Sequence, residues 1–183
     1  MLRRLGGTST AGGVDNRFKE NSISANGGLG IDIGAAGQNT NDPLLNFDSD
    51  NGPNDLQNHP IILAAERNIV GSNTIIRVRL ESAAAAEFLI ELFENGTNDG
   101  EGAVFLGSQS ATTSGGVVER EFQVSTAVGQ YVTATATEVI AGQAFKGSTS
   151  EFSPTVKVTT GVRPKVSDVK VKSSSLGLGS VDD

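Results

Sequence analysis

The sequence predicts an all-β protein built around a β-sandwich, and three observations support this fold class. Glycine occupies 23 of 183 positions, which is above the usual ~7% and typical of a chain with many turns. After Pro60, apolar and polar residues alternate with a period of two, whereas residues 21–60 are rich in Gly, Asn and Asp. With no Trp and eight Phe, the core must consist mainly of Val, Ile, Leu, Ala and Phe.

Residues 61–160 are predicted to form the sandwich. Ile76, Val78 and Leu80 alternate with charged residues, and Val or Ala alternates with Thr between positions 132 and 137; such patterns are typical of half-buried sheets. Seven short strands separated by Gly- or Asn-rich breaks indicate an immunoglobulin-like sandwich, in which Tyr131 has the position of a tyrosine corner. Strands are expected near 61–69, 73–81, 87–94, 103–112, 117–125, 130–138 and 150–158.

Residues 1–33 are predicted to form a β-helix-like coil or an N-terminal arm. Leu29, Ile31 and Ile33 alternate with Gly and Asp after the Gly27-Gly28 break, which predicts two short strands joined by a tight turn. One coil cannot bury its own core, because solenoids need about three stacked repeats for stability. We therefore expect this segment to pack on the sandwich, on upstream coils or on another copy of the chain.

Residues 34–60 form an Asp/Asn/Gly-rich connector without periodicity, and its oxygen-bearing side chains suggest a calcium site. Carboxylates two residues apart beside a glycine resemble the first half of a calcium loop. The EF-hand pattern is incomplete because Gln57, Asn58 and His59 stand where its bidentate Glu is expected. The alternative is that these side chains form Asx-turns and face solvent. The predicted calcium ligands are Asp42, Asp48, Asp50 and Asn54.

Residues 161–183 are predicted to form an extended basic stretch followed by a flexible tail, and the stretch KVSDVKVKS after Pro164 could add one strand. The net charge of −7 argues against nucleic acid as a partner. The absence of cysteine excludes disulfides, Cys-ligated zinc and thiol catalysis. No apolar run reaches the ~20 residues of a membrane-spanning helix.

No catalytic machinery is legible in the sequence, so we expect a protein that is not an enzyme. His59 is the only histidine, and it stands at a loop end, where we expect an exposed side chain; no G-x-S-x-G nucleophile motif occurs. Asp32 and Asp48 could supply a pair of carboxylates for glycoside hydrolysis, but such sites need a long concave face built by several coils. Gly27-Gly28-Leu29-Gly30 opens no predicted helix, so it lacks the helix terminus that binds phosphate and is better explained as a corner.

Several strings together resemble the C-terminal region of bacterial right-handed β-helix surface proteins: ISANGGLGIDIG, NDP, DSDNGPNDLQNHPII, GEGAVFLGS, GQYVTATAT and TSEFS. In that family the last coil leads through an Asp/Asn/Gly-rich connector into an immunoglobulin-like domain. The resemblance covers roughly residues 17–158 and implies an extracellular or cell-surface protein with a structural or adhesive role. This chain departs from the family in having room for only one or two coils and in the longer, apolar segment VIAGQAFKGS.

Two functions of different class follow. The first is a non-enzymatic structural or interaction module of an extracellular or cell-surface assembly, which self-associates through strand edges into a filament. Its partners are other copies of the chain or a larger surface assembly. The alternative is a calcium-dependent carbohydrate-binding module with a glycan partner. With one Tyr and no Trp, an aromatic sugar-binding platform would have to come from Phe residues.

Overall fold

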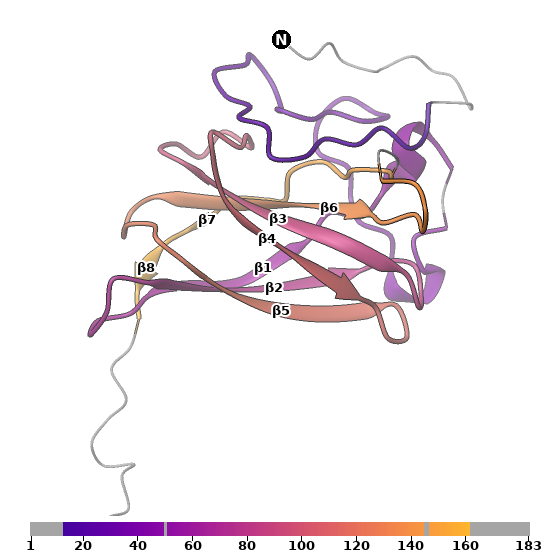
Figure 1. Cartoon of the computed structure of the whole chain (residues 1–183). Coiled ribbons are helices and arrows are strands. Elements are labelled where there is room, and N and C mark those ends of the chain that lie inside the picture. Colours follow the sequence, from indigo (N-terminus) through magenta and orange to yellow (C-terminus); the bar gives the residue numbers. More distant parts are fainter. Residues whose placement is uncertain (1–12, 50, 145–146, 162–183) are drawn as a thin grey trace, which may run out of the picture.

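The computed structural model describes residues 13–49, 51–144 and 147–161, which form two β-sheets and two short 3-10 helices (Figure 1). The sheets face each other as a β-sandwich, so the predicted all-β class is confirmed. The elements are η1 (Leu44–Asn46), η2 (Pro53–Leu56), β1 (Ile61–Arg67), β2 (Thr74–Glu81), β3 (Glu87–Asn95), β4 (Val104–Thr112), β5 (Val117–Val124), β6 (Tyr131–Glu138), β7 (Val156–Lys157) and β8 (Thr159–Thr160).

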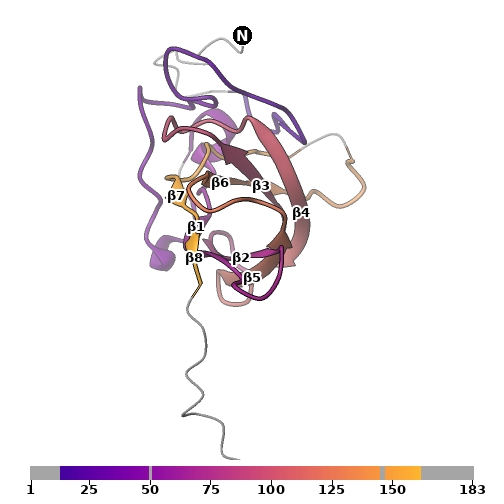
Figure 2. The same ribbon diagram turned by 90° about the vertical axis from the view of Figure 1, so that its left-hand side faces the viewer.

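One sheet has the strand order β5-β2-β1-β8 and the other has the order β4-β3-β6-β7. All described pairings between strands are antiparallel except that of β1 with β8, which is parallel. Because β7 and β8 are separated by Val158 alone, the chain changes sheets within a few residues. This crossing links the two sheets at the side of the sandwich away from β4 and β5 (Figure 2).

The main core lies between the sheets and follows the alternation seen in the sequence. On β2, Ile76, Val78 and Leu80 are fully buried. They face Phe88 and Leu92 of β3 across the sandwich, in one cluster with the small alanines of β6. Six of the seven expected strands lie within two residues of their predicted bounds. The period of two was readable because each of these strands has one inward apolar face.

The last expected strand, near 150–158, is only partly correct. This stretch forms β7 and then β8, each two residues long, with a separate bridge between Thr137 and Thr149. Serine side chains interrupt the ladder with β6: Ser150 Oγ and Ser153 Oγ each accept a hydrogen bond from a β6 main-chain N–H, at 3.0 Å. The strand expected after Pro164 lies outside the described residues.

The N-terminal segment, residues 13–33, covers the outer face of the β4-β3-β6-β7 sheet (Figures 1 and 2). The two short strands expected here do not form. The segment makes one isolated bridge, from Ile23 to Gly102, and its Ile31 and Ile33 side chains pack with Phe93 and Phe152 in a second apolar cluster. We expected this segment to pack on the sandwich, on upstream coils or on another copy of the chain, and in the described residues it packs on the sandwich. No described residue forms a stacked coil.

Gly102 allows this close packing. A side chain at this position would place a Cβ atom 2.5 Å from the ring of Phe152, a distance that real contacts do not reach. The Phe152 ring packs against Phe93 edge to face with ring centroids 5.3 Å apart. The N-terminal segment thus pairs with the main chain of Gly102 directly above an aromatic contact.

The connector, residues 34–60, runs past one end of the sandwich and contains η1 and η2. Its turn signals are confirmed by left-handed backbone at Phe47, Asp48, Asn54 and Asp55. Side-chain amides close it: Asn41 exchanges two hydrogen bonds with the main chain of His59, at 2.7 and 2.9 Å. The long loop is therefore cross-braced by its own polar side chains, which explains how it can lack a periodic sequence.

Candidate functional site

The outer edge of β4 is the first candidate site. β4 pairs with β3 alone and ends its sheet. Native proteins protect edge strands with charge, proline, bulges or short length, because unpaired main-chain groups can pair with another chain. Apart from one bulge at Leu106, the nine residues of β4 have none of these protections: they include no charge and no proline. The stretch 107–112 is in regular register with β3, and no other described strand pairs with its outer edge.

The other sheet edges are better protected. β5 has three consecutive charged residues at positions 119–121, and β7 and β8 are only two residues long. β1 is an edge only before Glu66, where β8 begins to pair with it, and a bulge lies between Ile62 and Ala64. β4 is therefore the longest described edge without charge.

Side chains hold the β4 and β5 edges next to each other. Gln109 Nε2 donates to the Glu121 carbonyl at 2.9 Å, and Arg120 Nε donates to the Ser110 carbonyl at 3.3 Å. Arg120 falls on the apolar parity of β5 in the sequence, and this contact gives its guanidinium a place at the rim of the sandwich. The two contacts use one main-chain group of β4, the Ser110 carbonyl.

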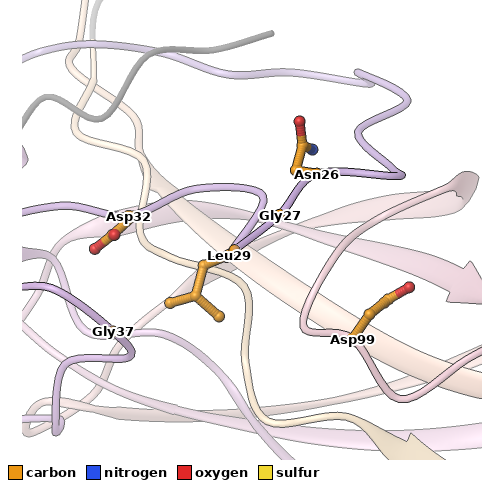
Figure 3. Close-up of a pocket in the computed structure, with 7 residues that line it drawn as sticks. Asn26, Gly27, Leu29, Asp32, Gly37 and Asp99 are labelled. Atoms are coloured by element: carbon orange, nitrogen blue, oxygen red, sulfur yellow. The ribbon is translucent and has the colours of Figure 1, made fainter.

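An acidic pocket of about 450 Å³ is the second candidate site (Figure 3). Leu29 lies between Asp32 of the N-terminal segment and Asp99 of the β3–β4 turn. Asp99 is held by Thr97 Oγ1, which donates at 2.6 Å, and by the Glu101 N–H at 3.3 Å. The Asp32 Oδ1 atom is buried and has no hydrogen-bond partner among the described residues. Glycines and Asn26 complete the wall: the lining residues are Asn26, Gly27, Gly28, Leu29, Asp32, Gly37 and Asp99.

The carboxylates of this pocket are partly used by the chain itself. Both Asp99 oxygens accept hydrogen bonds within the turn, and one Asp32 oxygen is buried. In Figure 3 the two carboxyl groups lie on opposite sides of Leu29 and point away from it. Sequence reasoning used Asp32 only in the context of glycoside hydrolysis and did not use Asp99. The turn that brings Asp99 beside residues 26–32 is set by the packing of the N-terminal segment.

Three buried glutamates accept hydrogen bonds from main-chain N–H groups between residues 20 and 39. Glu91 Oε1 accepts from the Glu20 N–H at 3.0 Å, and Glu101 Oε1 accepts from the Asn26 N–H at 2.8 Å. Both oxygens of Glu151 are used: they accept from the main-chain N–H groups of Ile33 and Asn39, at 2.9 and 2.7 Å. All three side chains are at most 2% exposed. Residues 20–39 are therefore held by carboxylates, although glutamate side chains are ordinarily exposed to solvent.

Burial raises the pKa of Glu91 and of Glu151, although main-chain N–H groups of Glu20, Asn39 and Ile33 oppose the shift. Glu91 also faces charged groups of the N-terminal segment: Glu20 raises its pKa further, whereas Lys19 and Arg17 lower it. Its second oxygen, Oε2, is buried and has no hydrogen-bond partner among the described residues, and the same holds for Oγ1 of Thr135, its cross-strand neighbour on β6.

We expect Glu91→Gln to raise the melting temperature at about pH 8 and to leave it nearly unchanged at about pH 4. The folded-state pKa of Glu91 is raised, so the stability linked to its protonation is present below the ordinary glutamate pKa and is lost as the pH rises through the raised value. The amide mimics the protonated form at every pH. Glu87→Gln, at an exposed position of the same strand, is the control and should leave the pH profile unchanged. A Glu91→Gln profile parallel to the wild-type profile would contradict the assignment.

Two of the residues predicted to bind calcium, Asp48 and Asn54, bond to different groups. Asp48 accepts hydrogen bonds from Gln57 Nε2 at 2.7 Å, Ser82 Oγ at 2.5 Å and the Asn58 N–H. Asn54 is 1% exposed and bonds with Asn16 and the Thr149 carbonyl. The hydrogen bonds of Asp42 with Asn58 use its main chain. Asp50 lies outside the described residues. In the described part of the chain, no three His, Cys, Asp or Glu side chains gather into a group that could hold a metal ion.

Two other residues singled out by the sequence also have structural contacts. His59 is 9% exposed, and burial lowers its pKa; its Nδ1 lies 3.2 Å from the Pro60 carbonyl. An exposed loop position was expected for this side chain, and that expectation is wrong, because the connector folds over it. Tyr131 is the first residue of β6, and the Lys157 ammonium lies 5.6 Å from its ring centroid.

The fold and these sites define the class of the molecule as an all-β sandwich whose N-terminal segment, residues 13–33, packs on one sheet. A scan against protein-family models finds no matching model, and a search of curated proteins finds no significant match. Neither helix in the described part of the chain has the length and apolar character needed to span a bilayer.

Proposed function

We propose that this protein is a non-enzymatic structural or interaction module of an extracellular or cell-surface assembly, and that it self-associates through a strand edge. The observation that supports this function best is the uncharged edge of β4. Nine residues without a charge or a proline at the end of a sheet give an incoming strand a row of main-chain donors and acceptors.

The strand order supports an immunoglobulin-like type for the sandwich. If β1, β2, β3, β5 and β6 correspond to strands A, B, C, E and F, the sheets read E-B-A and C-F, and β4 takes the position beside C that variable-type domains add. β7 follows F in the place of strand G. In this arrangement β4 is the outermost strand of its sheet, which is the position required for strand addition.

The cover on the outer face of the same sheet also supports an interaction role. The chain's own N-terminal segment covers the outer face of the β4-β3-β6-β7 sheet, where it packs on Phe152 and donates hydrogen bonds to buried glutamates. That face is therefore covered by the chain itself, whereas the outer edge of β4 pairs with no other described strand.

A lysine on the open edge is expected to abolish assembly. Ser110→Lys adds a charge in the regular part of β4, and a lysine on an edge strand opposes pairing with another chain. We expect the wild-type chain to form oligomers or filaments, measured by sedimentation velocity and negative-stain microscopy, and the variant to sediment as an 18.8 kDa monomer. Ser72→Lys, at an exposed serine in the β1–β2 turn, is the matched control and should assemble like the wild type.

Two outcomes would overturn this proposal. One is a wild-type chain that remains monomeric at all concentrations tested. The other is a glycan array that shows strong, calcium-dependent binding by the monomer, since the acidic pocket with Asp32 and Asp99 would then carry the alternative function of a carbohydrate-binding module. If Ser110→Lys and Ser72→Lys assemble equally well, the contact is not at β4.

A further inference from the structure

The described chain leaves the sandwich on the side opposite to the open edge. β8 ends the β5-β2-β1-β8 sheet, and the N–H of Gly161 donates to the Arg67 carbonyl at 2.9 Å. β4 lies beside β5, at the other end of that sheet's strand order. In Figure 2 β4 and β8 lie on different sides of the molecule. Whatever follows residue 161 therefore starts away from the β4 edge of the same copy.

The sequence after Pro164 has the pattern of a strand. Val169 and Val171 alternate with Lys170 and Lys172, and β-branched residues at a period of two favour extended backbone. These residues lie outside the described part of the chain. An extended stretch of eight residues, 165–172, would be about 26 Å long, enough to pair along most of a nine-residue strand such as β4.

The charges of the two partners are complementary. The stretch 163–172 has four basic residues and one Asp, in a chain whose net charge is −7. Beside β4, the edge of β5 has exposed Glu119 and Glu121 on either side of Arg120, and Arg79 and Arg77 of β2 lie opposite them. β4 itself has no charge that would repel a lysine-rich strand. The net negative charge of the acceptor chain thus favours a basic donor over an acidic one.

We propose that residues 165–172 of one copy add as a strand to the edge of β4 in a second copy. This inference rests on the proposed function and names its partner segment. Donor and acceptor are different surfaces on opposite sides of the molecule, so the contact is heterologous, and repeating it extends a filament instead of closing a dimer. The Arg120 guanidinium, which holds the Ser110 carbonyl at 3.3 Å, exchanges this bond for one from the donor strand.

A mixing experiment tests the proposal. One chain lacks residues 165–183, so it has an acceptor edge and no donor. The other is full-length Ser110→Lys, so it has a donor and a blocked edge. We expect each chain to be monomeric alone by sedimentation velocity, and the mixture to give a one-to-one dimer that does not grow further. Thermal unfolding of each chain alone checks that both sandwiches are folded.

The outcomes separate this inference from the proposed function. A truncated chain that still assembles by itself leaves self-association intact but shows that the tail is not the donor. Two folded monomers that form no dimer when mixed also overturn the tail as donor. A wild-type chain that never assembles contradicts the proposed function and this inference together.

A full-length variant avoids any effect of truncation. Val169→Lys with Val171→Lys breaks the alternation and is expected to abolish assembly, whereas Ser173→Lys with Ser175→Lys adds the same charge outside the alternating stretch and should preserve it. Because the charge pairing is screened by salt, the wild-type assembly should also weaken as the ionic strength rises. Equal assembly of the two double variants would overturn the proposal.

Discussion

Replacing Phe152 with alanine is expected to lower the free energy of unfolding by about 3–5 kcal/mol. Phe152 is 3% exposed and packs edge to face on Phe93, beneath the N-terminal segment. Removing the ring leaves a cavity whose lining includes Gly30 and Gly102, which have no side chains to fill it. The loss therefore combines the transfer free energy of the ring with the free energy of an unfilled cavity.

The region that loses stability distinguishes Phe152→Ala from a substitution in the main core. Phe152 belongs to the cluster beneath residues 18–33 and not to the main core between the sheets. Hydrogen exchange should therefore become faster in residues 18–39 before it changes in β2. Urea denaturation measures the total effect, and Phe47→Ala, at a ring that is 44% exposed, should cost about 1 kcal/mol or less. An equal cost for the two substitutions would contradict the packing of the N-terminal segment on the sheet.

Asp48→Asn is expected to cost about 2–3 kcal/mol. The carboxylate accepts hydrogen bonds from Gln57, Asn58 and Ser82, and so joins the connector to the end of β2. In asparagine an NH₂ group replaces one of the two carboxylate oxygens. This donor would face the donors that now bond to Asp48. The backbone of Asp48 is left-handed, with φ of 56°, and asparagine tolerates this conformation as well as aspartate does. The cost is therefore assigned to the side-chain contacts.

Asp42→Asn is the matched control in the same connector. The hydrogen bonds between Asp42 and Asn58 use the main chain of Asp42, so the substitution should leave the melting temperature nearly unchanged in the presence of a chelator. Repeating both measurements with excess calcium tests the predicted calcium site. If calcium raises the melting temperature of the wild type and both variants lose this increase, Asp42 and Asp48 bind the ion. An Asp48→Asn variant as stable as the wild type in chelator would contradict the role of the carboxylate as a brace.

The strands of the sandwich could be predicted because each has a local pattern. Alternation in β2 and β6 placed their inward faces correctly, and the absence of charge in β4 can be read directly from residues 104–112. The stretch 150–158 was less predictable, because its serines bond to β6 through their side chains. Local alternation does not show which polar residues replace the main chain in a ladder.

The contacts of the segment before β1 could not be predicted in the same way. Glu91 and Glu151 bond to main-chain N–H groups 71 and 118 residues away in the sequence. Nothing in a local pattern distinguishes such a buried acceptor from a solvated glutamate. Asp48 was identified as a residue with a special role, and the structure gives it the role of an internal brace; the calcium site remains a prediction.

By itself the sequence determined the all-β class, six strands of the sandwich and a boundary at Pro60 beyond which the strands begin. Tertiary structure alone decided that the segment before this boundary covers one sheet, that three glutamates fix it there, and that β4 remains an open edge. The physical reason is the range of the interactions. Alternating burial is encoded in neighbouring residues, whereas a buried carboxylate or an unpaired edge is defined by groups that come together only when the whole chain has folded.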